Sequence, residues 1–456
     1  MGRGKMKILL IWPPLPEYCV LTQEFSCCEP LGLEYIAAPV IDKFGVEILD
    51  MRFDKNLLEV LKQKEPDIVG LSIPYTTTVN VCNDLLKIIK AYNPNIKVII
   101  GGHHPTVGLR HISTEYVDYV IVGEGVETLR NLLEAIAQNG DLREINGLAF
   151  KASGEFIYNK SYELQTLDYY PQPARNLTAK YRDKYFHAHY KPVALMRFSY
   201  GCPYNCSFCV LWKLCNRKYI SRNNELVVKE LLELDNENIY VVDDEAFINT
   251  DNMNDLADRI QKNNIKKKYH MYVRSDTVAK NPGLFEKWAS IGLDSVLMGL
   301  ESIFEDDLNE YNKSISSKTA YESLKILHSN GVEVRANFII KPDYSKEKFH
   351  LVRKAVEQYD IDRPTFAVLT PFYGTDEYEK VKDKFIIEKL EFFDCYHTFM
   401  KTALPLKEFY YEFAELFKCA QNRKKDGNKE KVFYAGKSEN SFEEMIDKMK
   451  GSYIFY

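Results

Sequence analysis

Residues Arg197-Phe-Ser-Tyr-Gly-Cys202-Pro-Tyr-Asn-Cys206-Ser-Phe-Cys209 decide the fold, because three cysteines stand there at C-x3-C-x2-C spacing. The apolar run 193–196 before them predicts a buried strand. Thiolates are soft ligands that suit iron–sulfur clusters. Three of them on one short loop can bind three irons of a cubane and leave the fourth iron open. The alternatives are free core thiols or a zinc site, although a fourth ligand and a second C-x2-C pair are missing for zinc.

The composition is that of an ordinary globular protein. The chain has 456 residues, 45% of them hydrophobic and 27% charged, with a formal net charge of −5. This length allows two or three domains, and the charge lacks the basic excess typical of nucleic-acid binding. No apolar run approaches the roughly 18 residues of a membrane-spanning helix, and residues 8–12 are too short for the core of a signal peptide. We therefore expect a cytoplasmic protein without a transmembrane segment, with reduced thiols outside the loop.

Residues 1–145 predict a doubly wound α/β domain. Apolar runs alternate with helical patterns, and Val81, Leu85, Ile88 and Ile89 have the spacing of an amphipathic helix. The predicted strands are 7–12, 46–49, 68–73, 98–100 and 119–122. Such alternation indicates a parallel sheet covered on both faces, with ligands bound outside the carboxyl ends of its strands.

The ends of the third, fourth and fifth predicted strands carry glycines, hydroxyls and a few other polar groups. These residues are Ser72, Tyr75, Thr76, Thr77, Gly101, Gly102, His103, Gly123 and Glu124. Glycines allow a large flat ligand to approach the backbone closely, and hydroxyls can bond to its edge. Ordinary turn chemistry is the alternative for each loop. His103 and His104 could touch the ligand or serve a structural role.

Residues 146–190 are expected to form a connector with a small hairpin around Ser153-Gly154. Residues 191–375 contain six strand-like runs separated by helical patterns, at 193–199, 238–242, 269–273, 295–299, 332–339 and 365–370. Repeated strand–helix units predict a barrel or partial barrel, with its chemistry at the carboxyl ends of the strands. Residues 376–456 are expected to form a helical cap, in which the basic run 422–431 is a solvated loop.

Polar residues recur at the ends of the predicted barrel strands. Besides the cysteine loop they comprise Asp243, Asp244, Glu245, Arg274, Glu301 and, within the fifth strand, Asn337. A charged group in such a position is costly unless it is paired or binds something. The set therefore predicts either a ligand site or an internal network of salt bridges.

The cysteine loop resembles the signature of the radical S-adenosylmethionine (SAM) superfamily, through Gly201-Cys202-Pro203 and through Phe208 before the third cysteine. The resemblance implies that Cys202, Cys206 and Cys209 hold a [4Fe-4S] cluster, that SAM binds its open iron, and that SAM is cleaved to methionine and a 5′-deoxyadenosyl radical. It implies SAM contacts from Phe208 and from the strand-end residues just given, and an external electron donor of the flavodoxin or ferredoxin type. Lys341 departs from the family pattern, which usually has a glycine there.

The N-terminal loops resemble the cobalamin-binding domain that precedes many radical SAM enzymes. The stretches concerned are Cys28-Glu-Pro-Leu-Gly-Leu33, Gly101-Gly-His-His-Pro105 and Gly123-Glu-Gly-Val-Glu127. The strand-end residues of this domain would then contact cobalamin. Cobalamin proteins that ligate cobalt through histidine carry D-x-H-x-x-G after the second strand, whereas Arg52 stands at that position here. The resemblance therefore implies cobalamin bound base-off, without a histidine beneath the cobalt.

Residues 393–410 resemble the end of hopanoid C-3 methylases and related cobalamin-dependent radical SAM methyltransferases, and His397 there could be a substrate-pocket group or a packed core residue. The implied activity is methylation of an unactivated carbon of a lipid or natural-product substrate, with methyl supplied by methylcobalamin. Two alternatives stay open. One is a cobalamin-dependent radical cyclase or ring-rearranging enzyme without net methyl transfer; the other is a non-catalytic cobalamin or redox sensor, against which the intact cysteine loop argues.

Overall fold

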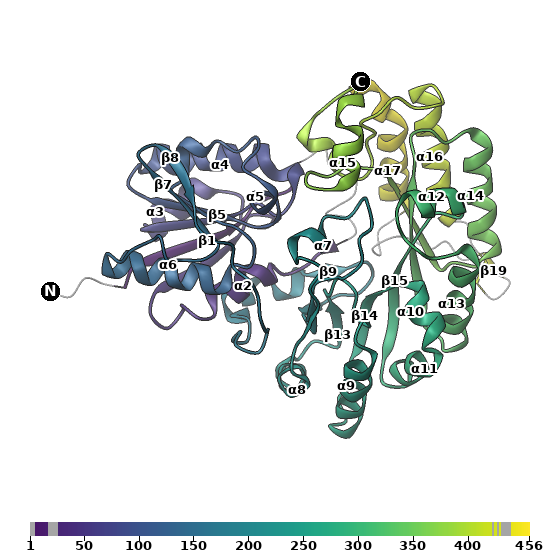
Figure 1. Cartoon of the computed structure of the whole chain (residues 1–456), viewed down its shortest axis with the longest axis horizontal. Coiled ribbons are helices and arrows are strands. Elements are labelled where there is room, and N and C mark those ends of the chain that lie inside the picture. The colour runs from purple at the N-terminus through teal and green to yellow at the C-terminus, as the bar shows by residue number, and fades with distance from the viewer. Residues whose placement is uncertain (1–4, 17–25, 422–423, 426–427, 430–438) are drawn as a thin grey trace. The chain divides into compact units, whose positions relative to one another are not determined.

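A computed structural model describes residues 5–16, 26–421, 424–425, 428–429 and 439–456 (Figure 1). They form two compact units. The first contains the N-terminal strand and residues 29–183, and the second contains residues 26–28 and 184–456. The stretch 146–190 is thus divided between the two units at residue 183. Part of the predicted solvated loop at 422–431 lies outside the described residues.

The first unit is built on a seven-stranded sheet in the order β3-β1-β4-β5-β6-β7-β8. The strands are β1 (Lys7–Trp12), β3 (Gly45–Asp50), β4 (Ile68–Ser72), β5 (Lys97–Gly101), β6 (Tyr119–Ile121), β7 (Leu148–Ala152) and β8 (Glu155–Tyr158). The first five pair in parallel, as the alternating pattern predicts, whereas β7 and β8 are antiparallel. The hairpin predicted within the connector is therefore present and extends this sheet.

Helices cover both faces of this sheet. They are α2 (Leu31–Ala37), α3 (Leu57–Lys64), α4 (Val79–Tyr92), α5 (His103–Val107) and α6 (Val126–Gln138), with 3-10 turns at Thr76–Thr78, Thr114–Tyr116 and Arg175–Lys184. Leu33 of α2 and Leu129 of α6 pack with Ile8 and Ile121 in one core. The helix predicted around residues 81–89 is confirmed, and Leu85 and Ile89 of its predicted apolar face are buried. Ile88 is 39% exposed, and the buried face is completed by Val79, Cys82 and Leu86.

The second unit contains a six-stranded parallel sheet in the order β10-β13-β14-β15-β16-β17, which confirms the predicted partial barrel. Its strands are β10 (Val193–Met196), β13 (Asn238–Val241), β14 (Lys268–Val273), β15 (Leu293–Glu301), β16 (Glu333–Ile340) and β17 (Arg363–Val368). The first strand ends earlier than the predicted residue 199. The reason is that Ser199–Tyr200 (β11) leaves the sheet to pair with Ile220–Ser221 (β12). A further short pair joins Ser26–Cys27 (β2) to Phe186–His187 (β9).

Helices follow the barrel strands and complete the second unit. They are α7 (Leu211–Leu214), α8 (Asn224–Glu233), α9 (Thr250–Lys262), α10 (Ser275–Lys280), α11 (Pro282–Ser290), α12 (Glu305–Glu310), α13 (Ser317–Ser329) and α14 (Lys346–Gln358). The C-terminal part is helical, with α15 (Asp376–Val381), α16 (Leu406–Gln421), α17 (Glu439–Gly451) and 3-10 turns at Lys382–Lys384, Leu390–Phe392 and Ser452–Phe455. The residue pairs Lys424–Lys425 (β18) and Asn428–Lys429 (β19) lie between the last two α-helices. Phe409, Phe413 and Phe417 of α16 join the barrel core. None of the described helices is long and apolar enough to cross a membrane.

Candidate cofactor sites

The cysteine loop begins at the carboxyl end of β10, where two acids bind its backbone. The Asp243 carboxylate accepts hydrogen bonds from the Phe198 amide (2.8 Å) and the Ser199 hydroxyl (2.6 Å). The Gly201 amide donates to Asp244 Oδ2 (3.0 Å). Gly201 has φ +88°, and a Cβ there would lie 2.1 Å from the Lys218 carbonyl oxygen. The loop can start in this conformation only with glycine, and Asp243 serves first to shape it.

The far side of the loop is held by α7 and the residues after it. Trp212 Nε1 donates to the Cys206 carbonyl oxygen (3.1 Å), and the Cys202 amide donates to Cys215 Sγ (3.4 Å). Sequence reasoning did not assign a role to either residue. Their spacing from the three cysteines is a local signal that could have suggested contact with the loop.

The three thiols lie in a low-dielectric environment. Burial raises the pKa of Cys202 to about 11 and that of Cys209 to about 12. Cys206 is buried as well, and all nine described cysteines are free. Among the described side chains, no three His, Cys, Asp or Glu converge on a single-ion site. In a cubane each thiolate binds a different iron, so three cysteines on this loop suit a [4Fe-4S] cluster.

The Phe208 side chain packs against apolar residues of the barrel. Its ring meets Tyr311 edge-on at a centroid distance of 5.5 Å, beside Ile339, Leu369 and Met400. The aromatic residue before the third cysteine therefore fixes the loop against β16 and β17.

Glu245 is the buried acid of the set that fits a cationic ligand. Burial raises its pKa to about 8, against the opposing effect of Arg274. Its Oε1 is buried and has no hydrogen-bond partner among the described residues. An orphaned carboxylate oxygen of this kind is costly unless it meets a donor, and an ammonium group such as that of SAM supplies one.

Several other members of the set form an internal network, which was the alternative reading of the sequence. Arg274 Nε contacts Asp276 Oδ1 (2.9 Å), and its guanidinium carbon lies 3.6 Å from the ring centroid of Tyr204 in the cysteine loop. Glu301 Oε1 accepts from Lys313 Nζ (2.6 Å), and the Asn337 amide oxygen accepts from the Thr365 hydroxyl. The predicted salt-bridge network is therefore present at this end of the barrel, and Glu245 is the member of the set with a buried oxygen left for a ligand.

Lys341, which stands where the family pattern has glycine, is held by acids. Its ammonium lies 2.6 Å from Glu310 Oε2, 3.5 Å from Asp307 Oδ1 and 3.6 Å from Asp343 Oδ2. These contacts fix the lysine in a network of its own.

In the first unit, the strand-end loops are shaped mainly by their backbone. Ser72 of β4 pairs with Gly101 of β5. Gly102 has φ +109°, and a Cβ there would lie 2.9 Å from the Ile73 carbonyl oxygen. Gly123 has φ +83°, its Cβ position is open, and its amide donates to Thr106 Oγ1 (3.1 Å). Gly102 is therefore required by the local backbone, whereas Gly123 leaves open space beside the chain. We call these strand ends the cradle, because loops without side chains suit a large flat ligand such as the corrin ring.

The side chains predicted around this cradle differ in exposure. Tyr75 and His103 are exposed, whereas Thr77 is buried. His104 is buried, with Nδ1 3.1 Å from Thr76 Oγ1 and Nε2 3.0 Å from the Arg110 carbonyl oxygen. Both ring nitrogens of His104 are therefore satisfied within the protein, and His103 is the histidine that a ligand can reach. The Glu124 carboxylate accepts a hydrogen bond from Tyr170 (3.4 Å).

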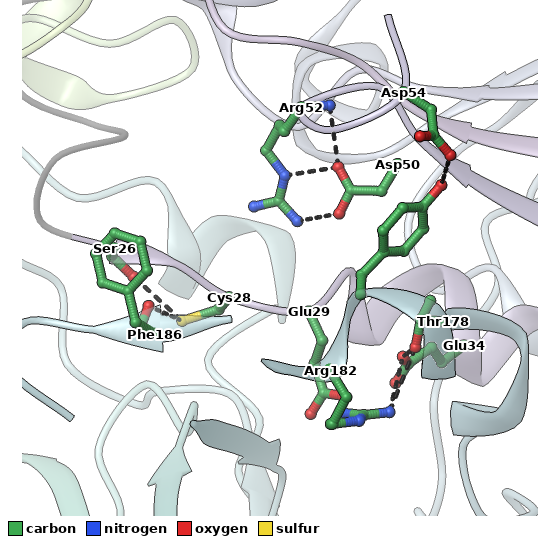
Figure 2. Close-up of polar contacts among 11 residues, drawn as sticks. Ser26, Cys28, Glu29, Glu34, Asp50, Arg52, Asp54, Thr178, Arg182 and Phe186 are labelled. Atoms are coloured by element: carbon green, nitrogen blue, oxygen red, sulfur yellow. Dashed lines mark hydrogen bonds and ion pairs between the residues drawn. The ribbon is translucent and has the colours of Figure 1, made fainter. Parts of the chain in front are cut away.

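Arg52 occupies the position of the cobalt-ligating histidine and forms a bidentate pair with Asp50 (Figure 2). Its Nε lies 2.8 Å from Oδ1 and its Nη2 lies 2.5 Å from Oδ2. The pair is buried at the carboxyl end of β3, with the guanidinium carbon 5.5 Å from the Trp12 ring centroid.

Glu29 and Glu34, in and after the Cys28–Leu33 stretch, anchor the end of the first unit. Arg175 and Arg182 both bind the Glu29 carboxylate, and Thr178 donates to Glu34 (Figure 2 shows Arg182 and Thr178). Burial, followed by the charge of Glu29, raises the pKa of Glu34 to about 8. The arginines therefore neutralise Glu29, and Glu34 is stabilised in its protonated form.

His397 lies in the core of the C-terminal part. Its Nδ1 lies 3.0 Å from Asp394 Oδ2 and its ring stacks on Phe392 at 4.0 Å between centroids. These contacts fit a packed core histidine on the Nδ1 side, whereas the buried Nε2 has no hydrogen-bond partner among the described residues, so both alternatives stay open.

Comparison with known proteins identifies both halves of the chain. The B12 binding domain family matches residues 19–133, and the Radical SAM superfamily matches residues 196–356. Hopanoid C-3 methylase of Methylococcus capsulatus is 30% identical over 431 residues, covering 91% of this chain and 80% of that protein. An anaerobic magnesium-protoporphyrin IX monomethyl ester cyclase of Rubrivivax gelatinosus is 25% identical over 359 residues, covering 74% of this chain and 63% of that protein.

Two solved structures share the fold. The cobalamin-dependent S-adenosylmethionine radical enzyme OxsB with aqua-cobalamin bound superimposes with a TM-score of 0.72 at 17% identity, covering 90% of this chain and 66% of that one. The radical S-adenosylmethionine methyltransferase TsrM from Kitasatospora setae, with cobalamin and a [4Fe-4S] cluster bound, gives 0.66 at 17% identity, covering 83% and 78%.

The chain belongs to the family of cobalamin-binding radical SAM enzymes, because its match to hopanoid C-3 methylase runs through both domains. Its cofactors are a [4Fe-4S] cluster, SAM and cobalamin.

Proposed function

We propose that the protein methylates an unactivated carbon of a lipid or natural-product substrate. The observation that carries this proposal is the 30% identity to hopanoid C-3 methylase along 91% of the chain. In this reaction class the cluster and SAM supply the radical chemistry and cobalamin carries the methyl group.

In this proposal the protein's own residues take the following roles, which their contacts support. Cys202, Cys206 and Cys209 hold the cluster, and the Gly201–Asp244 and Cys206–Trp212 hydrogen bonds fix their loop. Glu245 offers its orphaned Oε1 to the SAM ammonium. Burial of these groups excludes water, which strengthens their electrostatic interactions with a bound ligand.

The strand-end loops of the first unit hold the corrin, with cobalamin base-off. Gly101, Gly102 and Gly123 allow close approach of the ring, and Ser72, Thr76 and His103 border the same strand ends. The Arg52–Asp50 pair supports the absence of a histidine ligand beneath the cobalt, because a guanidinium cation at that position cannot ligate the metal. Paramagnetic resonance of the cob(II) form should show no coupling to an imidazole nitrogen; such a coupling would contradict this assignment.

The decisive experiment measures both products of SAM. Anaerobically reconstituted protein with cobalamin, a low-potential donor and extract containing substrate should form 5′-deoxyadenosine and S-adenosylhomocysteine together. Mass spectrometry of extracts from cells with and without the protein should reveal a compound that differs by one methylene. Cys206→Ala is the control for radical-dependent products.

The second candidate is a cyclase or ring-rearranging reaction without net methyl transfer. It is favoured by the match to the magnesium-protoporphyrin cyclase over 74% of the chain. Formation of 5′-deoxyadenosine without S-adenosylhomocysteine, in the presence of converted substrate, would select it over methyl transfer.

A further inference from the structure

The carboxyl end of β15 has an unusual backbone. Glu301 has φ +63°, in the left-handed region that residues with a side chain rarely adopt. The register with β16 shifts at the same place, between Gly299 and Glu301. Such conformations persist only where surrounding contacts impose them. The contact that fits this description is an ion pair on the neighbouring loop.

The Glu301 side chain meets Lys313 over Gly299. Lys313 Nζ lies 2.6 Å from Glu301 Oε1, and the two side chains are 7% and 10% exposed. A Cβ on Gly299 would lie 2.2 Å from that carboxylate oxygen and 2.7 Å from that ammonium. The pair therefore occupies the space that only a glycine at position 299 leaves open.

Lys313 belongs to a short segment, Tyr311–Lys313, that also binds the cysteine loop. The Tyr311 carbonyl oxygen accepts from the Ser207 amide (3.0 Å), and Asn312 Nδ2 donates to the Asn205 carbonyl oxygen (3.2 Å). The Lys313 carbonyl oxygen accepts from Arg274 Nη2 (3.1 Å), whose guanidinium lies over Tyr204. The backbone that carries the lysine is thus fixed to the loop that carries the cluster ligands.

We infer that Lys313 is a positioning residue of the SAM site, which holds the Glu301 carboxylate over Gly299 and aligns it with the cysteine loop. Lys313 occupies Oε1, and no hydrogen bond to Glu301 Oε2 is present among the described residues, so Oε2 is the acceptor left for a hydroxyl of bound SAM. Without the ammonium, the Glu301 carboxylate would be buried without its partner, which is costly and favours a side chain turned away from this position. This inference rests on SAM as the cofactor and does not depend on methyl transfer.

The test compares three lysine variants in cluster-reconstituted protein. Lys313→Met keeps the length of the side chain and removes its charge, and Lys313→Arg restores the charge. Lys318→Met is the matched control, because Lys318 is 85% exposed and its ion pair with Glu322 spans 3.9 Å. Gly299→Ala is the independent variant, since its Cβ displaces the same pair.

The readouts are iron and sulfide content, the SAM dissociation constant by equilibrium dialysis, and the change in the paramagnetic resonance spectrum of the reduced cluster on addition of SAM. Lys313→Met and Gly299→Ala should weaken SAM binding by about tenfold to a hundredfold, as loss of one partner of a buried ion pair predicts. In uncoupled SAM cleavage their KM should rise more than kcat falls. Lys313→Arg should recover most of the affinity, and Lys318→Met should match wild type.

Wild-type SAM affinity in Lys313→Met protein with full iron content would overturn the inference. The inference would also be overturned if Lys313→Met and Lys313→Arg lost the cluster to the same extent, while the cluster-containing fraction of each variant bound SAM with wild-type affinity. Both results are independent of whether S-adenosylhomocysteine forms, so they do not bear on the proposed methyl transfer.

Discussion

The two cofactor-binding regions are built by different means. In the second unit, buried charges such as Asp243 and the Glu301–Lys313 pair hold the cysteine loop and its surroundings. In the first unit, glycines at positive φ shape the strand-end loops, and the buried ion pairs Arg52–Asp50 and Glu29 with its two arginines lie outside those loops. A small reactive centre needs fixed side chains, whereas a large flat cofactor needs backbone that it can approach. The site in the second unit should therefore be sensitive to loss of side chains, and the site in the first unit to added ones.

The largest effect is expected from removing a cluster ligand. Cys206→Ala should abolish SAM cleavage, because two thiolates on this loop leave a cubane with two unligated irons. Iron content and 5′-deoxyadenosine formation measure the outcome, with Cys419→Ala, a cysteine on α16 away from the loop, as control. Retained SAM cleavage in Cys206→Ala would show that the loop is not the cluster site.

A large effect is also expected from an added side chain in the cobalamin cradle. Gly102→Ala combines backbone strain with a close contact to the Ile73 carbonyl oxygen, whereas Gly123→Ala adds strain alone. The free energy of unfolding should fall by about 1–3 kcal/mol in the first and less in the second, and cobalamin affinity should fall in both. Titration with cobalamin measures affinity. Gly283→Ala, at an open position without positive φ, is the control. Unchanged cobalamin affinity in both cradle variants would place the corrin elsewhere.

An intermediate effect concerns Glu34. Its pKa of about 8 lies above the ordinary 4.5, so the folded state binds an additional proton between these values. The free energy of unfolding should therefore fall as pH rises through this window, by about 1.4 kcal/mol per pH unit at most. Urea unfolding of wild type and Glu34→Gln at pH 5.5 and 7.5, both within this window, tests this. The glutamine variant should lose this contribution, and an identical pH dependence in the two proteins would refute the assignment.

The smallest effect is expected from Lys341, despite its departure from the family pattern. It pairs with Glu310, a partly exposed carboxylate that also binds Lys380. Lys341→Met should lower the free energy of unfolding by about 1–2 kcal/mol, because its partner Asp307 is buried whereas Glu310 is partly exposed. It should leave the KM for SAM nearly unchanged. Lys380→Met is the matched control. A KM increase like that expected for Lys313→Met would show that Lys341 reaches the SAM site.

The sequence determined the fold class and predicted the candidate cluster ligands, because both depend on patterns that are local in the chain. Alternating strand and helix periods predict parallel sheets, and the cysteine spacing places three thiols on one loop. The alternation of strand and helix patterns also predicted which loops follow the strands of the first unit. The helix around residue 85 shows the limit of local reading: Leu85 and Ile89 are buried as predicted, whereas Ile88 is exposed.

Only the tertiary structure decided which polar groups are paired with one another. A charge at the end of a strand has the same sequence pattern whether it binds a partner, as Glu301 binds Lys313, or is left with an orphaned oxygen, as in Glu245. The difference arises from a bulge, a left-handed residue and loops that meet across the barrel. Contacts between residues that are distant in sequence leave no periodic pattern in the sequence. The sequence therefore predicted the candidate site residues, and the tertiary structure showed which of them pair with one another.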